Sequence, residues 1–563
     1  MRKFGMIILI LGIFCALFFG LKAKFLFETL KTNNDLIKKE LNNNNNNAWL
    51  QFNWENLERY LIPIDEKWQK ILSLMPFIKK EIDFQNNIKQ IIAFNRDIQN
   101  GIFINNVLKN NQDNQEYLNK ISQLLNFKNF FRNYHLDLID KFFNDINYWF
   151  TLLGFNGEKN YLILYEVPSV SRPQGGLVTA YSILTLNKGI KAITFDSILS
   201  LDDLIMAKVV PPLPLQFVNN RWLFHDLNWF FDFPETAKKI MAWYNQTNVT
   251  PKIDGVITIN TSVINDLMDL FNINPNLSLI DINNIFIKGL TDSMDYTNSK
   301  TNKEILLGLM NELIQNIQNQ SPEKTILLQE QIIRNANNKD LEIYFNNDQL
   351  EYYFDNLNLT GKILSTPNDY LAVIFSNLSP VFKTNDVTKN ISLITDFSTT
   401  TITNTLIIKE EKRPLNLESY LEIYLPANIQ ILETQGLYLK SLPNTINYKK
   451  FGFIEDSDIV KIEQNKIKND NFEVYSENDK TIISGWAKPS INSVKIVYML
   501  PFVSSDVNKW RLILQKQSGI KEVIKYNIVL PKNKKIKPTL FSFDKPFILN
   551  NDFEINYELE QND

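Results

Sequence analysis

The chain contains almost no cysteine or histidine. Its 563 residues include one cysteine, Cys15, which lies inside an apolar N-terminal run. The rest of the chain therefore has no disulfide, no thiol nucleophile and no thiolate zinc site. The histidines are His135 and His225, so a multi-histidine metal centre is excluded. A metal site would need oxygen ligands, which favour Mg²⁺ or Ca²⁺.

An excess of charge of one sign is also missing. Lysine and arginine together number 59 and aspartate and glutamate 62, which gives a formal net charge of −3. Without a basic stripe, nucleic-acid binding is not expected. The sequence has no Walker loop, no serine–histidine–aspartate order and no internal repeat, and its length predicts several domains.

The N-terminus carries the longest apolar run. Residues from Phe4 to Leu21 are uncharged and are flanked on both sides by basic residues. This length is at the lower limit for a helix that spans a bilayer. A cleaved signal peptide is the alternative, but no small-x-small cleavage site follows the run. We therefore predict that residues 1–24 form a transmembrane signal anchor at the cell membrane, with the large domain extracytoplasmic.

Residues 25–157 are expected to contain a linker and a helical region. The asparagine run at residues 42–47 indicates a short flexible linker. The stretch 136–153 has apolar residues at alternating spacings of three and four, an a/d seam. These residues are Leu136, Ile139, Phe143, Ile146, Phe150 and Leu153. A stalk or a partner helix would use such a seam, but the few heptads favour packing within the same chain.

Near residue 160 the spacing of apolar residues changes from a helical pattern to a strand pattern. Segments 161–167, 176–187, 190–198 and 254–260 are rich in β-branched and aromatic residues and predict strands. The first and second segments are apolar on both faces, as in a sheet covered by helices on each side. Strands alternating with helical patterns predict a central α/β domain with a mixed sheet over residues 158–340.

The C-terminal part is expected to be β-rich. Short strands at regular intervals predict an antiparallel β-sandwich-like region over residues 365–545, followed by a tail at 546–563. Modules of this kind bind or brace more often than they catalyse. The overall fold class is therefore predicted as multidomain α+β.

An arginine and two glycines stand directly before the second strand, in "RPQGG". One interpretation is a turn that only Gly175 and Gly176 allow, with Arg172 as a surface charge. The other is an anion cradle, in which exposed amides beside a guanidinium hold a phosphate. Arg172, Gly175 and Gly176 are thus candidate anion-binding residues.

Polar residues also lie among the aromatics of "WLFHDLNW". Asp226 and Asn228 would be hydrogen-bonded inside a loop core or displayed at a cleft. Asp196 ends the third strand and could reach the same rim, so these three are candidate polar residues of a cleft. Asp232, followed by Glu235 in "DFPE", is expected to form a capping box.

The motifs "RPQGG", "WLFHDLNW" and "DGV" (254–256), taken in this order, resemble the bacterial domain-of-unknown-function family 4012. Segments of the C-terminal part, such as "GWAKPSINSVKIVYMLP", resemble its β-rich tail, so the resemblance covers nearly everything after residue 158. The family usually carries a glutamate two positions before the arginine, where this chain has Val170. The resemblance implies a membrane-anchored extracytoplasmic protein of unknown activity.

More remotely, the chain is similar to the LytR–CpsA–Psr proteins. Those membrane-anchored enzymes move glycopolymers from polyprenyl-pyrophosphate carriers with the help of Mg²⁺ and arginines. Their paired aspartate–arginine clusters have no counterpart here.

These observations lead to competing functions. The first is a non-catalytic protein of the bacterial cell envelope that binds a surface glycopolymer or an envelope protein. The alternative is a glycopolymer phosphotransferase or phosphate-ester hydrolase that uses Mg²⁺ and the Arg172 anion cradle. The sequence names no catalytic residue, no metal ligand and no certain cofactor.

Overall fold

The computed structural model describes residues 24–42, 53–65, 69–70, 72–109, 115–132, 134, 136–294, 300–365, 368–378, 388–411, 418–442, 446–487, 493–504, 507–537 and 545–561. The chain divides into two compact units. The first comprises residues 1–158, 187–190 and 318–326, and the second comprises residues 159–186, 191–317 and 327–563.

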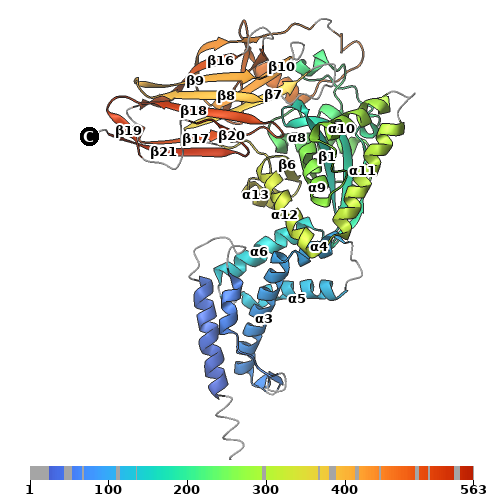
Figure 1. Cartoon of the computed structure of the whole chain (residues 1–563), viewed down its shortest axis with the longest axis vertical. Helices are drawn as coiled ribbons and strands as arrows, with labels where there is room; N and C mark the ends of the chain where they lie inside the picture. Colours follow the sequence, from blue (N-terminus) through green and yellow to red (C-terminus); the bar gives the residue numbers. More distant parts are fainter. Residues whose placement is uncertain are drawn as a thin grey trace, which may run out of the picture. The chain divides into compact units, whose positions relative to one another are not determined.

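The first unit is helical (Figure 1). Residues 24–42 form a helix. The following elements are η2 (Trp54–Tyr60), α3 (Pro76–Gln99), α4 (Ile102–Leu108), α5 (Gln115–Phe131) and α6 (Asp137–Leu152). The predicted a/d seam lies along α6, where Ile139, Phe143, Ile146 and Phe150 are each at most 2% exposed. They belong to a core shared with α3, α4 and α5, so the seam packs within the chain.

The predicted transmembrane helix needs a correction. In the part of the chain that the structure describes, no helix has the length and apolarity needed to cross a membrane. Residues 1–23, on which the prediction rests, lie outside the described residues. The location at the cell membrane, which was inferred from the same run, stays a prediction.

A mixed sheet forms the centre of the second unit, with strand order β3-β2-β1-β5-β6 and β4 paired to β2. The strands are β1 (Lys159–Arg172), β2 (Gly175–Leu186), β3 (Ile190–Ile193), β4 (Asp196–Ser197), β5 (Gly255–Asn260) and β6 (Leu341–Phe345). β1 and β5 run parallel, whereas β1–β2 and β5–β6 are antiparallel. Residues 161–165 are all at most 6% exposed. Because successive side chains of a strand point to opposite faces, both faces of β1 are covered.

Helices surround this sheet. They are α7 (Leu199–Asp202), α8 (Phe233–Gln246), α9 (Thr261–Phe271), α10 (Leu279–Met294), α11 (Lys300–Asn319), α12 (Pro322–Asn337) and α13 (Asp348–Asp355), with the short 3₁₀ turns η3 (Leu213–Phe217) and η4 (Phe224–Asp226). α9 and α10 contact β1, while α8 contacts β5 and β6. The α/β character and the mixed sheet agree with the sequence-based expectation.

The C-terminal half of the same unit is a β-sandwich (Figure 1). The larger sheet has the order β13-β14-β15-β10-β7-β17-β21-β19, with β12 on β15, and the smaller has the order β11-β16-β9-β8-β18-β20. The strands are β7 (Asp369–Asn377), β8 (Lys389–Asp396), β9 (Thr401–Glu410), β10 (Ser419–Pro426), β11 (Gln430–Gln435), β12 (Leu437–Tyr438), β13 (Ile467–Lys468), β14 (Glu473–Glu477), β15 (Lys480–Ala487), β16 (Val494–Val503), β17 (Lys509–Leu514), β18 (Glu522–Val529), β19 (Lys534–Ile536), β20 (Phe547–Leu549) and β21 (Phe553–Gln561), and α14 (Ser457–Asn465) precedes β13.

The sandwich is not purely antiparallel, which corrects the prediction. β17 runs parallel to β7 in the larger sheet, and β18 runs parallel to β8 in the smaller one. Residues 515–521 connect β17 to β18 and therefore pass from one sheet to the other. A shared core, to which β7 contributes Val373 and β8 contributes Leu393, joins the inner faces of the sheets.

Candidate functional site

The "RPQGG" segment forms the tip of the β1–β2 hairpin. Arg172 is the last residue of β1 and pairs with Gly175 at the start of β2. Pro173 and Gln174 therefore make the two-residue connection. Arg172 is only 2% exposed and Gln174 only 1%. The tip of the hairpin is thus an interior part of the molecule, and the expected opening of Arg172 to a cleft is not observed.

The glycines of this hairpin are required by close packing and not by a left-handed backbone. Neither Gly175 nor Gly176 has a positive φ. A Cβ on Gly176 would overlap the main-chain carbon and oxygen of Val167 and lie 2.5 Å from the nitrogen of Pro168. A Cβ on Gly175 would overlap the carboxylate of Glu166. The expected turn that only glycine can make is therefore replaced by a close approach between paired strands.

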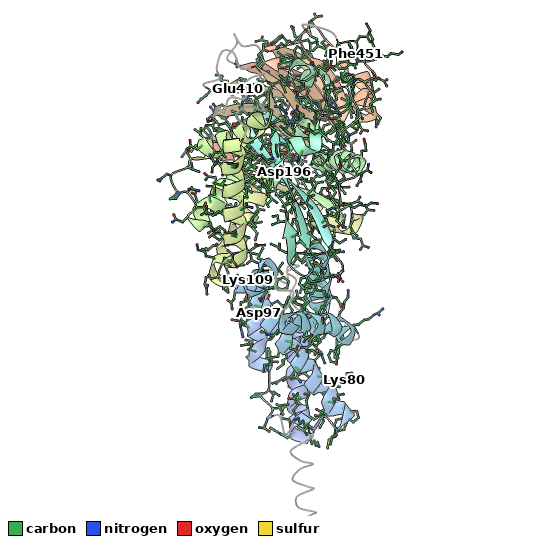
Figure 2. All side chains as sticks on the ribbon, turned by 90° about the vertical axis from the view of Figure 1, so that its right-hand side faces the viewer. Lys80, Asp97, Lys109, Asp196, Glu410 and Phe451 are labelled. Carbon is green, nitrogen blue, oxygen red and sulfur yellow. The ribbon has the colours of Figure 1, made fainter. Side chains whose placement is uncertain are left out.

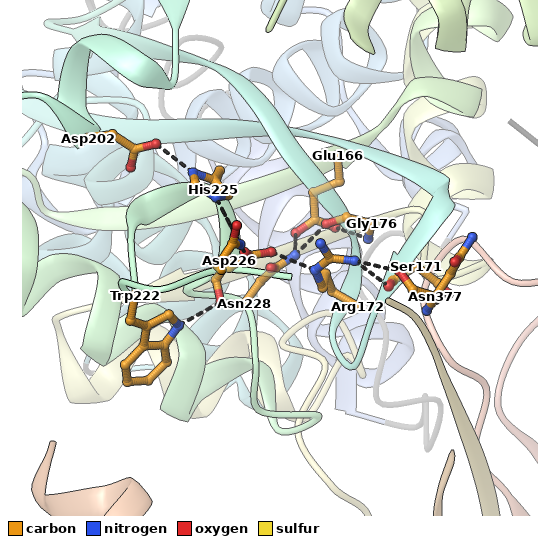
Figure 3. Close-up of polar contacts among 11 residues, drawn as sticks. Glu166, Ser171, Arg172, Gly176, Asp202, Trp222, His225, Asp226, Asn228 and Asn377 are labelled. Carbon is orange, nitrogen blue, oxygen red and sulfur yellow. Dashed lines mark hydrogen bonds and ion pairs between the residues drawn. The ribbon is translucent and has the colours of Figure 1, made fainter. Parts of the chain in front are cut away.

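The guanidinium of Arg172 is held by buried partners (Figure 3). Its Nε donates to Oδ1 of Asp226 at 2.6 Å, and the side chains are 2% and 1% exposed. Its Nη1 donates to the carbonyls of Ser171 and Asn377, each at 3.0 Å. Burial opposes ionisation of Asp226, but the charges of Arg172 and His225 outweigh burial and lower its pKa. Arg172 and Asp226 form an internal ion pair.

His225 extends this ion pair toward α7. Its Nδ1 lies 2.6 Å from Oδ2 of Asp202, and its Nε2 lies 3.3 Å from Oδ2 of Asp226. Burial alone would lower the pKa of His225, yet the charge of Asp226 and the hydrogen bond to Asp202 raise it to about 10. Trp222 fixes the loop, because its Nε1 donates to the carbonyl of Asp226 at 2.9 Å. The segment "WLFHDLNW" therefore forms a hydrogen-bonded loop core. This was one of the alternatives, beside display at a cleft, that the sequence left open.

Glu166 lies at the centre of a neighbouring contact set that the sequence reasoning missed. Asn228 donates from Nδ2 to Glu166 Oε1 at 2.9 Å and to the Gly176 carbonyl at 2.6 Å. Burial raises the pKa of Glu166 to about 8, against the effect of the hydrogen bond from Asn228. A signal was available, since Glu166 is the one charged residue in the apolar segment 161–167. It supplies a carboxylate near the glycines although Val170 stands at the family's usual glutamate position.

Residues of the β-sandwich form hydrogen bonds with the same hairpin. Gln517, which is fully buried, donates from Nε2 to the carbonyls of Arg172 at 2.8 Å and Phe375 at 3.0 Å. The main-chain N–H of Asn377 donates to Ser171 Oγ at 3.1 Å. We use the name hairpin lock for the set of Arg172, Asp226, Asn228, Glu166 and Gln517. It joins the mixed sheet to β7 and to the β17–β18 connection.

The remaining predicted residues lie elsewhere. Asp196, labelled in Figure 2, pairs with Lys303 at 3.1 Å and is 39% exposed; it is not part of the hairpin lock. Asp232 stands at the N-cap of α8, but its side chain makes no capping bond there. It accepts the main-chain N–H of Ile363 at 2.7 Å, and burial raises its pKa to about 6. The predicted capping box is therefore wrong.

Within the described residues, no group of three or more histidine, cysteine, aspartate or glutamate side chains is arranged to hold a metal ion. Arg172, Asp226 and Asn228 come together as predicted from their motifs, but they face one another and not a cleft.

A groove of about 590 Å³ lies next to the hairpin lock. The end of β1 and the N-termini of α9 and α10 line one side, and the β17–β18 connection and β20 line the other. We call it the junction groove and define it by Ser169, Ser262, Asn377, Lys516 and Lys521. Most of its polar lining consists of serine, threonine and asparagine, and Leu279, Ile280 and Ile548 add exposed apolar surface.

The fold and the groove together define an α/β domain docked on a β-sandwich, with an open polar groove at their junction. Residues 156–273 match the family model described as Protein of unknown function (DUF4012). This part of the chain, which runs from β1 through α9 and contains the three motifs, matches that family's model as the motifs predicted. No curated protein and no solved structure matches the chain. Similarity to the LytR–CpsA–Psr proteins is not shown.

The raised pKa of Glu166 makes stability depend on pH. The folded state holds this proton more firmly than the unfolded chain, whose glutamate pKa is near 4.5. The stabilising contribution is therefore complete below the unfolded pKa and is lost as pH rises through about 8. Glu166→Gln cannot ionise, so we expect urea unfolding to show a smaller loss of stability between about pH 6 and about pH 9 than in the wild type. The exposed Glu304→Gln is the control, and a pH profile of Glu166→Gln parallel to the wild type would contradict the assignment.

Proposed function

We propose that this protein is a non-catalytic binding protein whose junction groove holds a polyhydroxylated ligand, such as a glycan of the cell surface. The observation that carries the proposal is a set of buried side-chain oxygens, on residues that line the groove, that have no hydrogen-bond partner among the described residues. They are Ser169 Oγ, Ser262 Oγ and Asn377 Oδ1.

Buried polar atoms in folded proteins nearly always have a partner. Asn377 is 8% exposed, so its unpaired Oδ1 carries a desolvation cost that a bound hydroxyl group would remove. Several hydroxyl and amide groups beside apolar side chains suit a sugar, which presents hydroxyls along its edge and C–H groups on its faces. The volume of about 590 Å³ falls in the usual range for small-ligand sites.

The catalytic alternative has less support. It needs Arg172 to clamp a phosphate, yet the Nε of that side chain donates to Asp226 and its Nη1 donates to the carbonyls of Ser171 and Asn377. Releasing the guanidinium would leave Asp226 buried without its partner, at a cost of about 3–5 kcal/mol.

The test is a glycan array probed with the wild-type chain and with Ser262→Ala. Since Ser262 Oγ has no partner among the described residues, its removal breaks no described hydrogen bond, and stability should change by less than about 0.5 kcal/mol. We expect Ser262→Ala to bind array glycans more weakly, by about fivefold, the effect of one hydrogen bond of about 1 kcal/mol.

Thr434→Ala is the matched control. Its Oγ1 also has no partner among the described residues, but Thr434 lies on β11, away from the groove. Its array signals should equal those of the wild type. An array without any wild-type signal, or equal weakening by both variants, would contradict the proposed function.

A further inference from the structure

We propose that the glycan bound in the junction groove carries an anionic group, a phosphate or a carboxylate. This inference rests on the proposed function and specifies its ligand. It is carried by the charged side chains of the groove and by the start of α9, together with the unpaired Oδ1 of Asn377 that also supports the proposed function.

Cationic side chains predominate in the groove. Lys389, Lys516 and Lys521 line it, against one acidic residue, Asp340. Lys389 already pairs with Glu410 at 3.0 Å. Lys516 is 7% exposed, and its Nζ donates to the carbonyls of Asn338 at 2.9 Å and Gln517 at 3.2 Å. These acceptors are neutral, so they leave the positive charge of Lys516 uncompensated by the contacts that hold it.

Lys521 completes the positive side of the groove. Its side chain is exposed, while its main-chain carbonyl accepts the N–H of Lys389 at 3.3 Å. A lysine ammonium has three donors and binds a phosphate or carboxylate as a point charge. Lys516 at the base and Lys521 at the rim are therefore suited to one anionic group between them and the strand end.

The N-terminus of α9 adds to this field. Thr261 and Ser262 are its first residues and line the groove. The N-cap residue, Asn260, makes no side-chain capping bond to the helix; its Nδ2 donates to Ser518 Oγ at 3.0 Å and Asp340 Oδ1 at 3.3 Å. First-turn amides and the helix dipole favour an anion. The nearly buried Asn377, whose Oδ1 has no described partner, lines the same groove and indicates a ligand there independently of the helix.

Asp340 is the charge that opposes this arrangement. Its Oδ1 accepts Asn260 Nδ2, and its main-chain carbonyl accepts the N–H of Asn260 at 2.9 Å. It therefore orients the N-cap residue of α9. With Lys389 paired to Glu410, Lys516 and Lys521 still outnumber Asp340 among the charged residues that line the groove.

The test uses the full chain on an array of matched glycan sets, each present in neutral, phosphorylated and uronic-acid form. We expect the charged members to bind about tenfold more tightly than their neutral counterparts, and salt to weaken only the charged members. Lys521→Gln should weaken charged glycans by about two- to fivefold and weaken their neutral counterparts less, because an exposed charge contributes modestly. The phosphate and uronate arms identify which anion the groove prefers.

Lys252→Gln is the control. Lys252 is exposed and precedes β5, at the opposite end of that strand from Thr261 and Ser262. Equal binding of neutral and charged members, or equal losses in Lys521→Gln and Lys252→Gln, would overturn the anionic ligand and leave the proposed function intact. If no glycan set gave a binding signal, both the anionic ligand and the proposed function would be overturned.

Discussion

Arg172→Ala is expected to destabilise the protein by about 3–5 kcal/mol, because it removes the buried guanidinium that pairs with Oδ1 of Asp226 and leaves His225 to balance the charge of that carboxylate. The side chains are 2% and 1% exposed, so water cannot replace the guanidinium. The same substitution also removes donors from the carbonyls of Ser171 and Asn377. Urea unfolding followed by tryptophan fluorescence measures the loss.

An exposed arginine gives the control for this effect. Arg511 pairs with Glu554 at 2.6 Å, and both side chains are 41% exposed. Arg511→Ala should cost no more than about 1 kcal/mol. If Arg172→Ala unfolds at the same urea concentration as the wild type, Arg172 does not stabilise the fold, and the role given to the hairpin lock is contradicted. That outcome is what an exposed Arg172, as read from the sequence, would give.

Gly176→Ala is expected to prevent stable folding, with a loss of more than about 3 kcal/mol. The new Cβ would overlap the main chain of Val167 and approach Pro168 N to 2.5 Å. A main chain in a paired strand cannot move aside as the end of a flexible side chain can. The β1–β2 register would have to shift, which would displace Arg172 from Asp226. Soluble yield and circular dichroism measure the outcome.

Gly308→Ala separates this effect from a general sensitivity to glycine replacement. Gly308 lies within α11, and a Cβ there would meet nothing within 4 Å. Alanine should stabilise the helix by about 0.5–1 kcal/mol. A Gly176→Ala variant as stable as Gly308→Ala would contradict the close approach of the hairpin strands.

Strand and helix patterns allowed much of the fold to be predicted. Segments 161–167 and 254–260 were predicted as strands, and the structure places them as parallel neighbours inside the mixed sheet. The parallel pairs of the sandwich could not be predicted, because a strand's own residues do not record which distant strand it joins. β17 and β7 are separated by more than a hundred residues, and strands of both sheets lie between them in the chain.

The candidate site was predicted in part. The motifs brought Arg172, Asp226 and Asn228 together correctly, since unusual polar residues in apolar surroundings need one another. The burial of Asp226 and Asn228 was one of the alternatives left open. The burial of Arg172 was not predicted, because Gln517 and Asn377, which contact it from the sandwich, have no sequence relation to the hairpin. The junction groove was missed for the same reason, as its walls come from segments that meet only in the folded chain.

The central claim is that the junction groove, and not the "RPQGG" turn, is the binding surface. Hydrogen–deuterium exchange with the strongest array glycan tests it most directly, because bound ligand slows exchange of the amides that it covers. If the ligand binds in the junction groove, we expect slower exchange in peptides covering residues 261–263, 278–280 and 519–521. We expect no change in the exchange of residues 222–228, because the hairpin lock already closes their loop. Slower exchange confined to 172–176 and 222–228, with the groove peptides unchanged, would contradict it.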